Sequence, residues 1–178
     1  MTMSKTAIIY WPKGGSVENA ATRIYNQLKD RHADVSIFEI TETDISELCN
    51  YDTFLVGGST VGADNWTDAY SGEQWGPFHN KVKETKPDLF KGKKVALFGL
   101  GDQILYPHDY VNDMKLLFDR FIELHADLTG LYIDNNYDFI ESDAFINGMF
   151  IGLALDQKNQ DNLTDGRISK WLDSLLID

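Results

Sequence analysis

Short apolar runs alternate along this chain with longer segments in which apolar residues recur every three or four positions. The runs are typical of buried strands, and we expect strands at 6–10, 35–38, 53–57, 95–98, 128–133 and 150–154. The longer segments predict amphipathic helices over about 18–31 and 75–85, after Val111, and along the apolar stripe from Ile168 to Leu176. Strands alternating with helices in this way predict an α/β protein whose parallel sheet is covered on both faces.

The last part of the chain departs from simple alternation. Polar residues 134–138 follow the run 128–133, and the next apolar run starts only at Phe150. We therefore expect an edge strand that is interrupted by a long insertion. The sequence contains no repeat, linker or low-complexity tract, so we expect one domain over residues 1–178.

Composition and charge narrow the possible functions. The 178 residues are 43% hydrophobic and carry a net charge of −12. A nucleic-acid-binding protein needs a basic surface, so this charge argues against nucleic-acid binding. No apolar run is long enough to span a membrane, and the first residues lack a signal-peptide core. Cys49 is the single cysteine, so no internal disulfide can form. We expect a cytoplasmic monomer that binds neither nucleic acid nor membrane.

The turn between the first strand and the first helix is a candidate anion site. It consists of Trp11, Pro12, Lys13, Gly14, Gly15, Ser16 and Val17. Backbone N–H groups at a helix N-terminus bind phosphate, and the two glycines allow them to converge on a ligand. Lys13 could supply charge. The order matches neither a Walker loop nor a dinucleotide fingerprint, and an ordinary turn capped by Ser16 is the alternative.

A second candidate follows the run 95–98, where a glycine-rich turn carries a carboxylate and a tyrosine. Its residues are Gly99, Leu100, Gly101, Asp102, Gln103 and Tyr106. In open α/β sheets ligands bind just beyond the carboxyl ends of the strands. The glycines allow backbone to approach a flat ring, and Tyr106 can lie against its face. This turn therefore predicts a binding site for a planar heterocycle.

The loop after the third strand is rich in aromatic residues. It begins with Ser59, Thr60, Val61 and Gly62 and continues through Trp66 and Tyr70 to Trp75. Either Trp66 or Tyr70 could cover the second face of a planar ligand. Trp75 begins a predicted helix, so we expect its side chain to pack into the core.

Other chemistries lack support in the sequence. Asp134, Asn136 and Asp138 imitate the start of a calcium loop, but Phe139 and Phe145 stand where that loop needs Gly and Glu. The histidines show no metal-ligand spacing with Cys49. No nucleophile motif such as G-x-S-x-G occurs, and the acidic cluster of a phosphoryl receiver does not fall at the strand ends.

Taken together, these residues resemble the flavodoxins, the small FMN-binding electron carriers, and specifically their long-chain form. The resemblance is carried by the turn 99–103 with Tyr106 and by the C-terminal segment from Gly152 to Trp171. The interrupted last strand is the mark of long-chain members. The resemblance implies a doubly wound parallel sheet of five strands in the order 2-1-3-4-5, with helices on both faces.

The resemblance also implies roles for individual residues. Tyr106 would stack on one face of the flavin, and the backbone around Gly99, Leu100 and Asp102 would meet its pyrimidine edge, with Asp109 nearby. Asp156 would reach the ribityl hydroxyls. Ser59 and Thr60 match the start of the second flavin loop, and the turn 11–17 matches the phosphate loop.

Two departures from the family pattern stand out. The family's phosphate loop reads [ST]-x-T-G-x-T, whereas this chain has Pro-Lys-Gly-Gly-Ser-Val, in which only Ser16 offers a hydroxyl, at a neighbouring position. Each hydroxyl contact contributes about 1 kcal/mol, so we expect weaker phosphate binding, partly offset by Lys13. The second departure is Val61, where many relatives have an aromatic residue.

The function implied is a low-potential one-electron carrier that binds FMN non-covalently and is not an enzyme. Its partners would be flavin reductases and iron–sulfur oxidoreductases, which dock on an acidic face around the flavin. Two other classes stay open. One is an FMN-dependent oxidoreductase that reduces quinones, and the other is a flavin-free binding module of the same fold.

Overall fold

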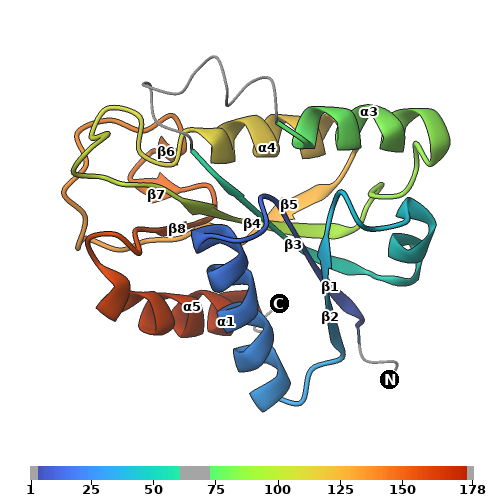
Figure 1. Cartoon of the computed structure of the whole chain (residues 1–178), viewed down its shortest axis with the longest axis horizontal. Coiled ribbons are helices and arrows are strands. Elements are labelled where there is room, and N and C mark those ends of the chain that lie inside the picture. Colours follow the sequence, from blue (N-terminus) through green and yellow to red (C-terminus); the bar gives the residue numbers. More distant parts are fainter. Residues whose placement is uncertain (1–3, 61–72, 176–178) are drawn as a thin grey trace.

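The computed structural model describes residues 4–60 and 73–175, and its centre is a parallel sheet. The strand order is β2-β1-β3-β4-β5, with β8 also paired to β4, as Figure 1 shows. The strands are β1 (Thr6–Tyr10), β2 (Val35–Glu39), β3 (Thr53–Ser59), β4 (Lys94–Leu100), β5 (Asp127–Thr129) and β8 (Leu153–Leu155). This order confirms the expected doubly wound arrangement.

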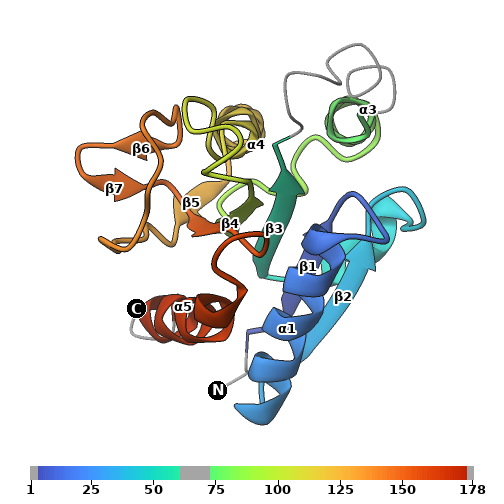
Figure 2. The same ribbon diagram turned by 60° about the vertical axis from the view of Figure 1, so that its left-hand side comes forward.

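Helices cover both faces of the sheet. The α-helices are α1 (Ser16–Asp30), α3 (Trp75–Thr85), α4 (Asp113–Glu123) and α5 (Asp161–Leu175). In Figure 2, α1 and α5 lie on one face, and α3 and α4 lie on the other. A short 3-10 helix, η1 (Ile45–Asn50), was not predicted from the sequence. Helix α1 begins two residues before its predicted start, with Gly15 as N-cap.

The central strands β1, β3 and β4 are mainly apolar because both faces of the sheet are covered there. Residues of β1, β3 and β4 have side chains that are essentially inaccessible, among them Ile8, Ile9, Phe54, Val56, Leu97 and Phe98. The Gly57 backbone lies so close to the Phe98 ring that no larger residue fits, since a Cβ at Gly57 would lie 2.0 Å from that ring. Trp75 is 5% exposed and packs edge-on against Phe78, which confirms its predicted place in the core.

The interrupted edge strand is present. Strand β5 pairs with the first half of β4, with Thr129 opposite Ala96. Strand β8 pairs with the second half, with Leu153 opposite Phe98. The insertion between them, residues 130–152, contains the hairpin β6 (Phe145–Ile146) and β7 (Met149–Phe150).

The predicted bounds of these last strands were wrong. The strand expected over 128–133 ends at Thr129, because Gly130 adopts a left-handed conformation with φ of 81°. Leu131 and Ile133 then point outward and are 53% and 56% exposed. The run 150–154 is likewise broken, since Phe150 ends the hairpin before β8 begins.

Two absences hold for the described part of the chain. None of its helices is long and apolar enough to cross a membrane. Residues 4–60 and 73–175 also contain no group of three or more His, Cys, Asp or Glu side chains arranged to hold a metal ion.

Candidate functional site

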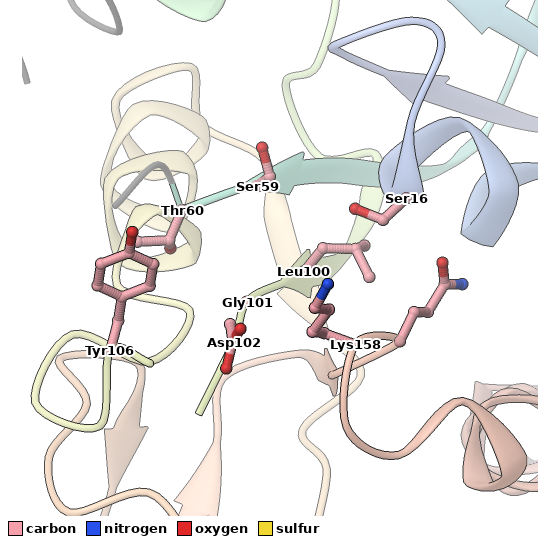
Figure 3. A pocket seen from close by; sticks show the side chains of 9 residues that line it. Ser16, Ser59, Thr60, Leu100, Gly101, Asp102, Tyr106 and Lys158 are labelled. Atoms are coloured by element: carbon pink, nitrogen blue, oxygen red, sulfur yellow. The ribbon is translucent and has the colours of Figure 1, made fainter. Parts of the chain in front are cut away.

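A pocket opens at the carboxyl ends of β3 and β4, beside the start of α1. Its volume is about 390 Å³, within the usual range for small-molecule sites. The lining residues are Ser16, Ser59, Thr60, Leu100, Gly101, Asp102, Tyr106, Gln157 and Lys158. Figure 3 shows Ser16 and Tyr106 on opposite sides of this hollow, with Leu100 and Gly101 between them. The position agrees with the rule that parallel sheets bind ligands at this edge.

The loop after β4 is shaped by the carboxylate of Asp102. One of its oxygens accepts hydrogen bonds from the backbone N–H groups of Ile104 at 3.1 Å and Leu105 at 2.8 Å, and from the Asn159 amide at 2.8 Å. Burial by itself would raise the pKa of Asp102, but the bonds from Leu105, Asn159 and Ile104 outweigh burial, so the pKa lies below its ordinary value. Asp102 is therefore a fixed negative charge at the pocket wall.

The same turn places Tyr106 at the pocket rim. The Tyr106 N–H donates to the Asp102 carbonyl at 2.9 Å, and the Tyr106 side chain is half-buried. Gly101 is required on the inner side of the turn, because a Cβ there would lie 3.0 Å from the Tyr110 ring and 3.1 Å from the Val111 nitrogen. Ile104 and Leu105, next to the tyrosine, are 58% and 64% exposed.

Ser59 and Thr60, at the end of β3, line another part of the pocket, with Thr60 near Tyr106 in Figure 3. The Thr60 N–H donates to the Leu100 carbonyl at 3.0 Å, and the Thr60 hydroxyl oxygen accepts from the Asp113 N–H at the start of α4, also at 3.0 Å. Thr60 thereby ties the ends of β3 and β4 to a helix. The predicted site residues Val61, Gly62 and Trp66, together with the alternative Tyr70, lie outside the described residues.

The turn between β1 and α1 presents backbone donors. The Trp11–Pro12 peptide is cis, and Gly14 is left-handed with φ of 84°. Gly15 caps α1 through its backbone alone, with no side-chain bond. Within 4–60 and 73–175, no acceptor pairs with the N–H groups of Gly15, Ser16, Val17 or Glu18. These free N–H groups are donors of the kind that an anion site at a helix N-terminus requires. The Val17 side chain is buried, so only its backbone can serve a ligand.

The charges at this turn differ from the sequence-based expectation. The Lys13 ammonium donates to both carboxylate oxygens of Glu42, at 2.9 and 3.1 Å, and Lys13 does not line the pocket. Its charge is thus paired with that of Glu42. The Glu18 carboxylate instead reaches back from the first turn of α1 and accepts the Gly14 N–H.

Asp156 is buried between the loops that follow β8 and β4. Its residue is 1% exposed, and its two carboxylate oxygens accept the N–H groups of Gln103, Lys158 and Asn159 as well as the Asn159 amide, at 2.8–3.1 Å. With these bonds made, the carboxylate faces protein and does not line the pocket. It ties the loop after β8 to the loop after β4, and its contact with ribityl hydroxyls stays a prediction.

Asp109 also lies off the pocket. It is exposed, and its carboxylate accepts the Asn112 amide at 3.3 Å, just before α4. Two pocket residues, Gln157 and Lys158, were missed by the sequence analysis. They follow the end of β8, which adjoins the end of β4, so the strand-end rule could have found them.

The fold defines a protein of the doubly wound α/β class, with a pocket at the carboxyl edge of the sheet that is lined by Ser16 at the start of α1 and by the ring of Tyr106. Comparisons with known proteins narrow this class. A family model described as flavodoxin matches residues 8–171. A flavodoxin from Enterobacter agglomerans is 35% identical over 177 residues, which cover 97% of each chain. A flavodoxin from Synechocystis sp. is 31% identical over 173 residues, which cover 97% of this chain and 96% of the relative. This chain belongs to the flavodoxin family.

Solved structures agree with this assignment. The crystal structure of Fusobacterium nucleatum flavodoxin bound to flavin mononucleotide matches with a TM-score of 0.77 and 25% identity, covering 98% of each chain. A single-site mutant of that flavodoxin, also bound to flavin mononucleotide, matches with the same TM-score and 26% identity, covering 98% of this chain and 96% of that chain.

Proposed function

We propose that this chain is a one-electron carrier that binds FMN non-covalently in the pocket between Ser16 and Tyr106 and passes electrons between redox enzymes. One observation carries the proposal. The pocket joins an anion-binding turn to a half-buried tyrosine at the carboxyl edge of the sheet, in a chain that belongs to the flavodoxin family. Phosphate and aromatic ring are the two ends of FMN.

The residues present fit this cofactor. The free N–H groups at the start of α1 would hold the phosphate, with Ser16 adding a hydroxyl. Tyr106 would lie against the ring, and the backbone of Leu100 and Gly101 would meet the ring's polar edge. FMN supplies the redox chemistry when bound, and the protein supplies its position and electrostatics.

The protein's charge would set a low reduction potential. The chain has a net charge of −12, and Asp102 is ionised at the pocket wall. Negative charge near the cofactor disfavours the addition of an electron. Lys158 is the one cation among the residues that line the described pocket, and its charge opposes this effect.

The same acidity supports protein partners rather than a small substrate. Ile104 and Leu105 are exposed beside Tyr106. The exposed acidic residues Asp109 and Glu141 lie by the same loop, where the Glu141 N–H donates to the Pro107 carbonyl at 2.9 Å. An apolar centre with an acidic surround suits a redox partner that presents a basic face, such as a flavin reductase or an iron–sulfur oxidoreductase. The insertion 130–152 supports placement among long-chain flavodoxins. A cytoplasmic monomer is the form in which we expect the carrier to act.

The absorption spectrum of freshly purified protein tests the proposal. We expect flavin bands, release of FMN on acid treatment, and two resolved one-electron steps in a potentiometric titration. Protein that stays colourless after incubation with FMN would overturn the proposal in favour of a flavin-free binding module. Sustained oxidation of NAD(P)H by the purified protein would instead favour a quinone-reducing enzyme.

A further inference from the structure

The Glu18 carboxylate occupies part of the anion-binding turn itself. It accepts the N–H of Gly14, the left-handed residue at the centre of the turn. Glu18 lies in the first turn of α1, where a carboxylate is favoured by the helix dipole and can reach back toward the residues before the helix. The protein's own carboxylate thus takes one backbone donor of this turn.

The charges around the turn strengthen this competition. Lys13, the cation nearest along the chain, is paired with Glu42 at 2.9 Å. Burial, followed by the charges of Glu18 and Glu39, raises the pKa of Tyr10 above its ordinary value, so these two carboxylates act on the end of β1. Hydroxyl side chains that would favour phosphate are absent from residues 12–15, which read Pro-Lys-Gly-Gly.

We propose that Glu18 is a specificity-determining residue that a ligand phosphate must displace, so that this site accepts phosphate-free flavins, the riboflavin class, with an affinity close to that for FMN. The inference rests on the proposed flavin site. A dianionic phosphate loses part of its binding free energy to the displacement of a charge-assisted hydrogen bond and to repulsion by the displaced carboxylate. Riboflavin has no phosphate and binds only at the ring end of the pocket, so neither the displacement nor the repulsion lowers its affinity.

The test compares the affinities of FMN and riboflavin for the flavin-free full chain, measured by quenching of flavin fluorescence. For the unaltered chain we expect dissociation constants within about tenfold of each other. Glu18→Gln keeps the side-chain length and removes the charge, and we expect it to tighten FMN binding about fivefold while riboflavin binding stays within twofold. Glu84→Gln is the matched control, because Glu84 is exposed on α3, away from the pocket, and its substitution removes the same charge. We expect it to change neither constant.

Three outcomes would overturn the inference. They are FMN binding that is unchanged or weakened by Glu18→Gln, equal tightening of both flavins, and FMN that binds the unaltered chain more than about tenfold tighter than riboflavin. If neither flavin binds the unaltered chain, the proposed function itself fails. A flavin-free readout separates the two cases. Inorganic phosphate should shift the amide resonances of Gly14 and Gly15 at lower concentration in Glu18→Gln than in the unaltered chain, and an equal or higher concentration in the variant would count against a competing carboxylate.

Discussion

The guanidinium of Arg167 lies 4.0 Å from the centroid of the Tyr137 ring, so a helix of the core holds the aromatic centre of the insertion through a cation–π contact. The same group donates to the Asp134 carboxylate at 3.0 Å and to the Asn136 carbonyl at 2.8 Å. Arg167 is 4% exposed. These contacts fasten residues 130–152 to α5, which itself packs under β8.

Replacing Arg167 with Met should therefore destabilise the protein strongly. The change leaves the Asp134 carboxylate without its charged partner, and we expect the free energy of unfolding to fall by about 3 kcal/mol. Urea denaturation checks this. Arg23→Met, which removes an ion pair with Asp161 at the protein surface, should cost less than about 1 kcal/mol. Equal losses in the two variants would contradict the buried role of Arg167.

Asp156→Ala should lower stability rather than act through flavin binding alone. The substitution removes the acceptor for three backbone N–H groups and an amide, and we expect a loss of about 2–3 kcal/mol in flavin-free protein. Thermal unfolding of the flavin-free chain measures it. Unchanged stability together with weakened FMN binding would restore the role first expected for this carboxylate.

Gly130 and Gly148 form a matched pair, because both have φ of 81°. A Cβ at Gly148 meets no atom within 4 Å, whereas one at Gly130 would lie 2.9 Å from the Ala96 Cβ and 3.0 Å from the Trp171 indole nitrogen. Gly148→Ala should cost about 1–2 kcal/mol from backbone conformation alone. Gly130→Ala should cost at least 1 kcal/mol more, measured by urea denaturation, and a cost no greater than that of Gly148→Ala would show that the site relaxes freely.

Stability should fall in mildly acidic solution because of His79. Burial lowers the pKa of His79 below its ordinary value of 6.5, despite the opposing charge of Glu123. As the pH falls below about 6.5, the unfolded chain takes up this proton first, so folding is penalised by up to ~1.4 kcal/mol per pH unit until the folded protein is protonated too. His79→Gln should flatten the decline in the free energy of unfolding over this range, and an unchanged slope would contradict the assignment.

Tyr106→Leu should weaken FMN binding about fivefold, since the aromatic contact contributes about 1 kcal/mol beyond its area. Tyr106→Phe, which keeps the ring, should bind FMN within about twofold of the unaltered chain. Fluorescence titration measures both constants. Equal weakening in the two variants would assign the effect to the hydroxyl rather than to ring contact.

The sheet was predictable because its strands are buried on both faces. Continuous apolar runs such as residues 53–57 and 95–98 have no other stable place, and the observed β3 and β4 contain them. The strand predicted over 128–133 was too long, because a short apolar segment has the same composition whether it pairs with a neighbouring strand or lies on the surface. Only the left-handed turn at Gly130 decides that Leu131 and Ile133 face solvent.

The residues that line the pocket were predictable where their position at the end of a strand places them there. They were less predictable where the position of a side chain depends on the residue with which it pairs. Ser16, Thr60 and Tyr106 follow from the ends of their strands, and all three line the pocket. Lys13 and Asp156 each have a partner distant in sequence, Glu42 and Gln103 respectively, which no local pattern reveals.

The edge strand shows how the insertion could be gained or lost. Thr129 pairs with Ala96 and Leu153 pairs with Phe98. The chain therefore leaves the edge of the sheet and returns to it with only one position of β4, Leu97, left unpaired between β5 and β8. A single residue in place of 130–152 would pair opposite Leu97 and join β5 and β8 into one continuous strand. Strands β5 and β8 therefore keep along β4 the register of one continuous strand, and the insertion leaves the pairing of the sheet on either side of it unchanged.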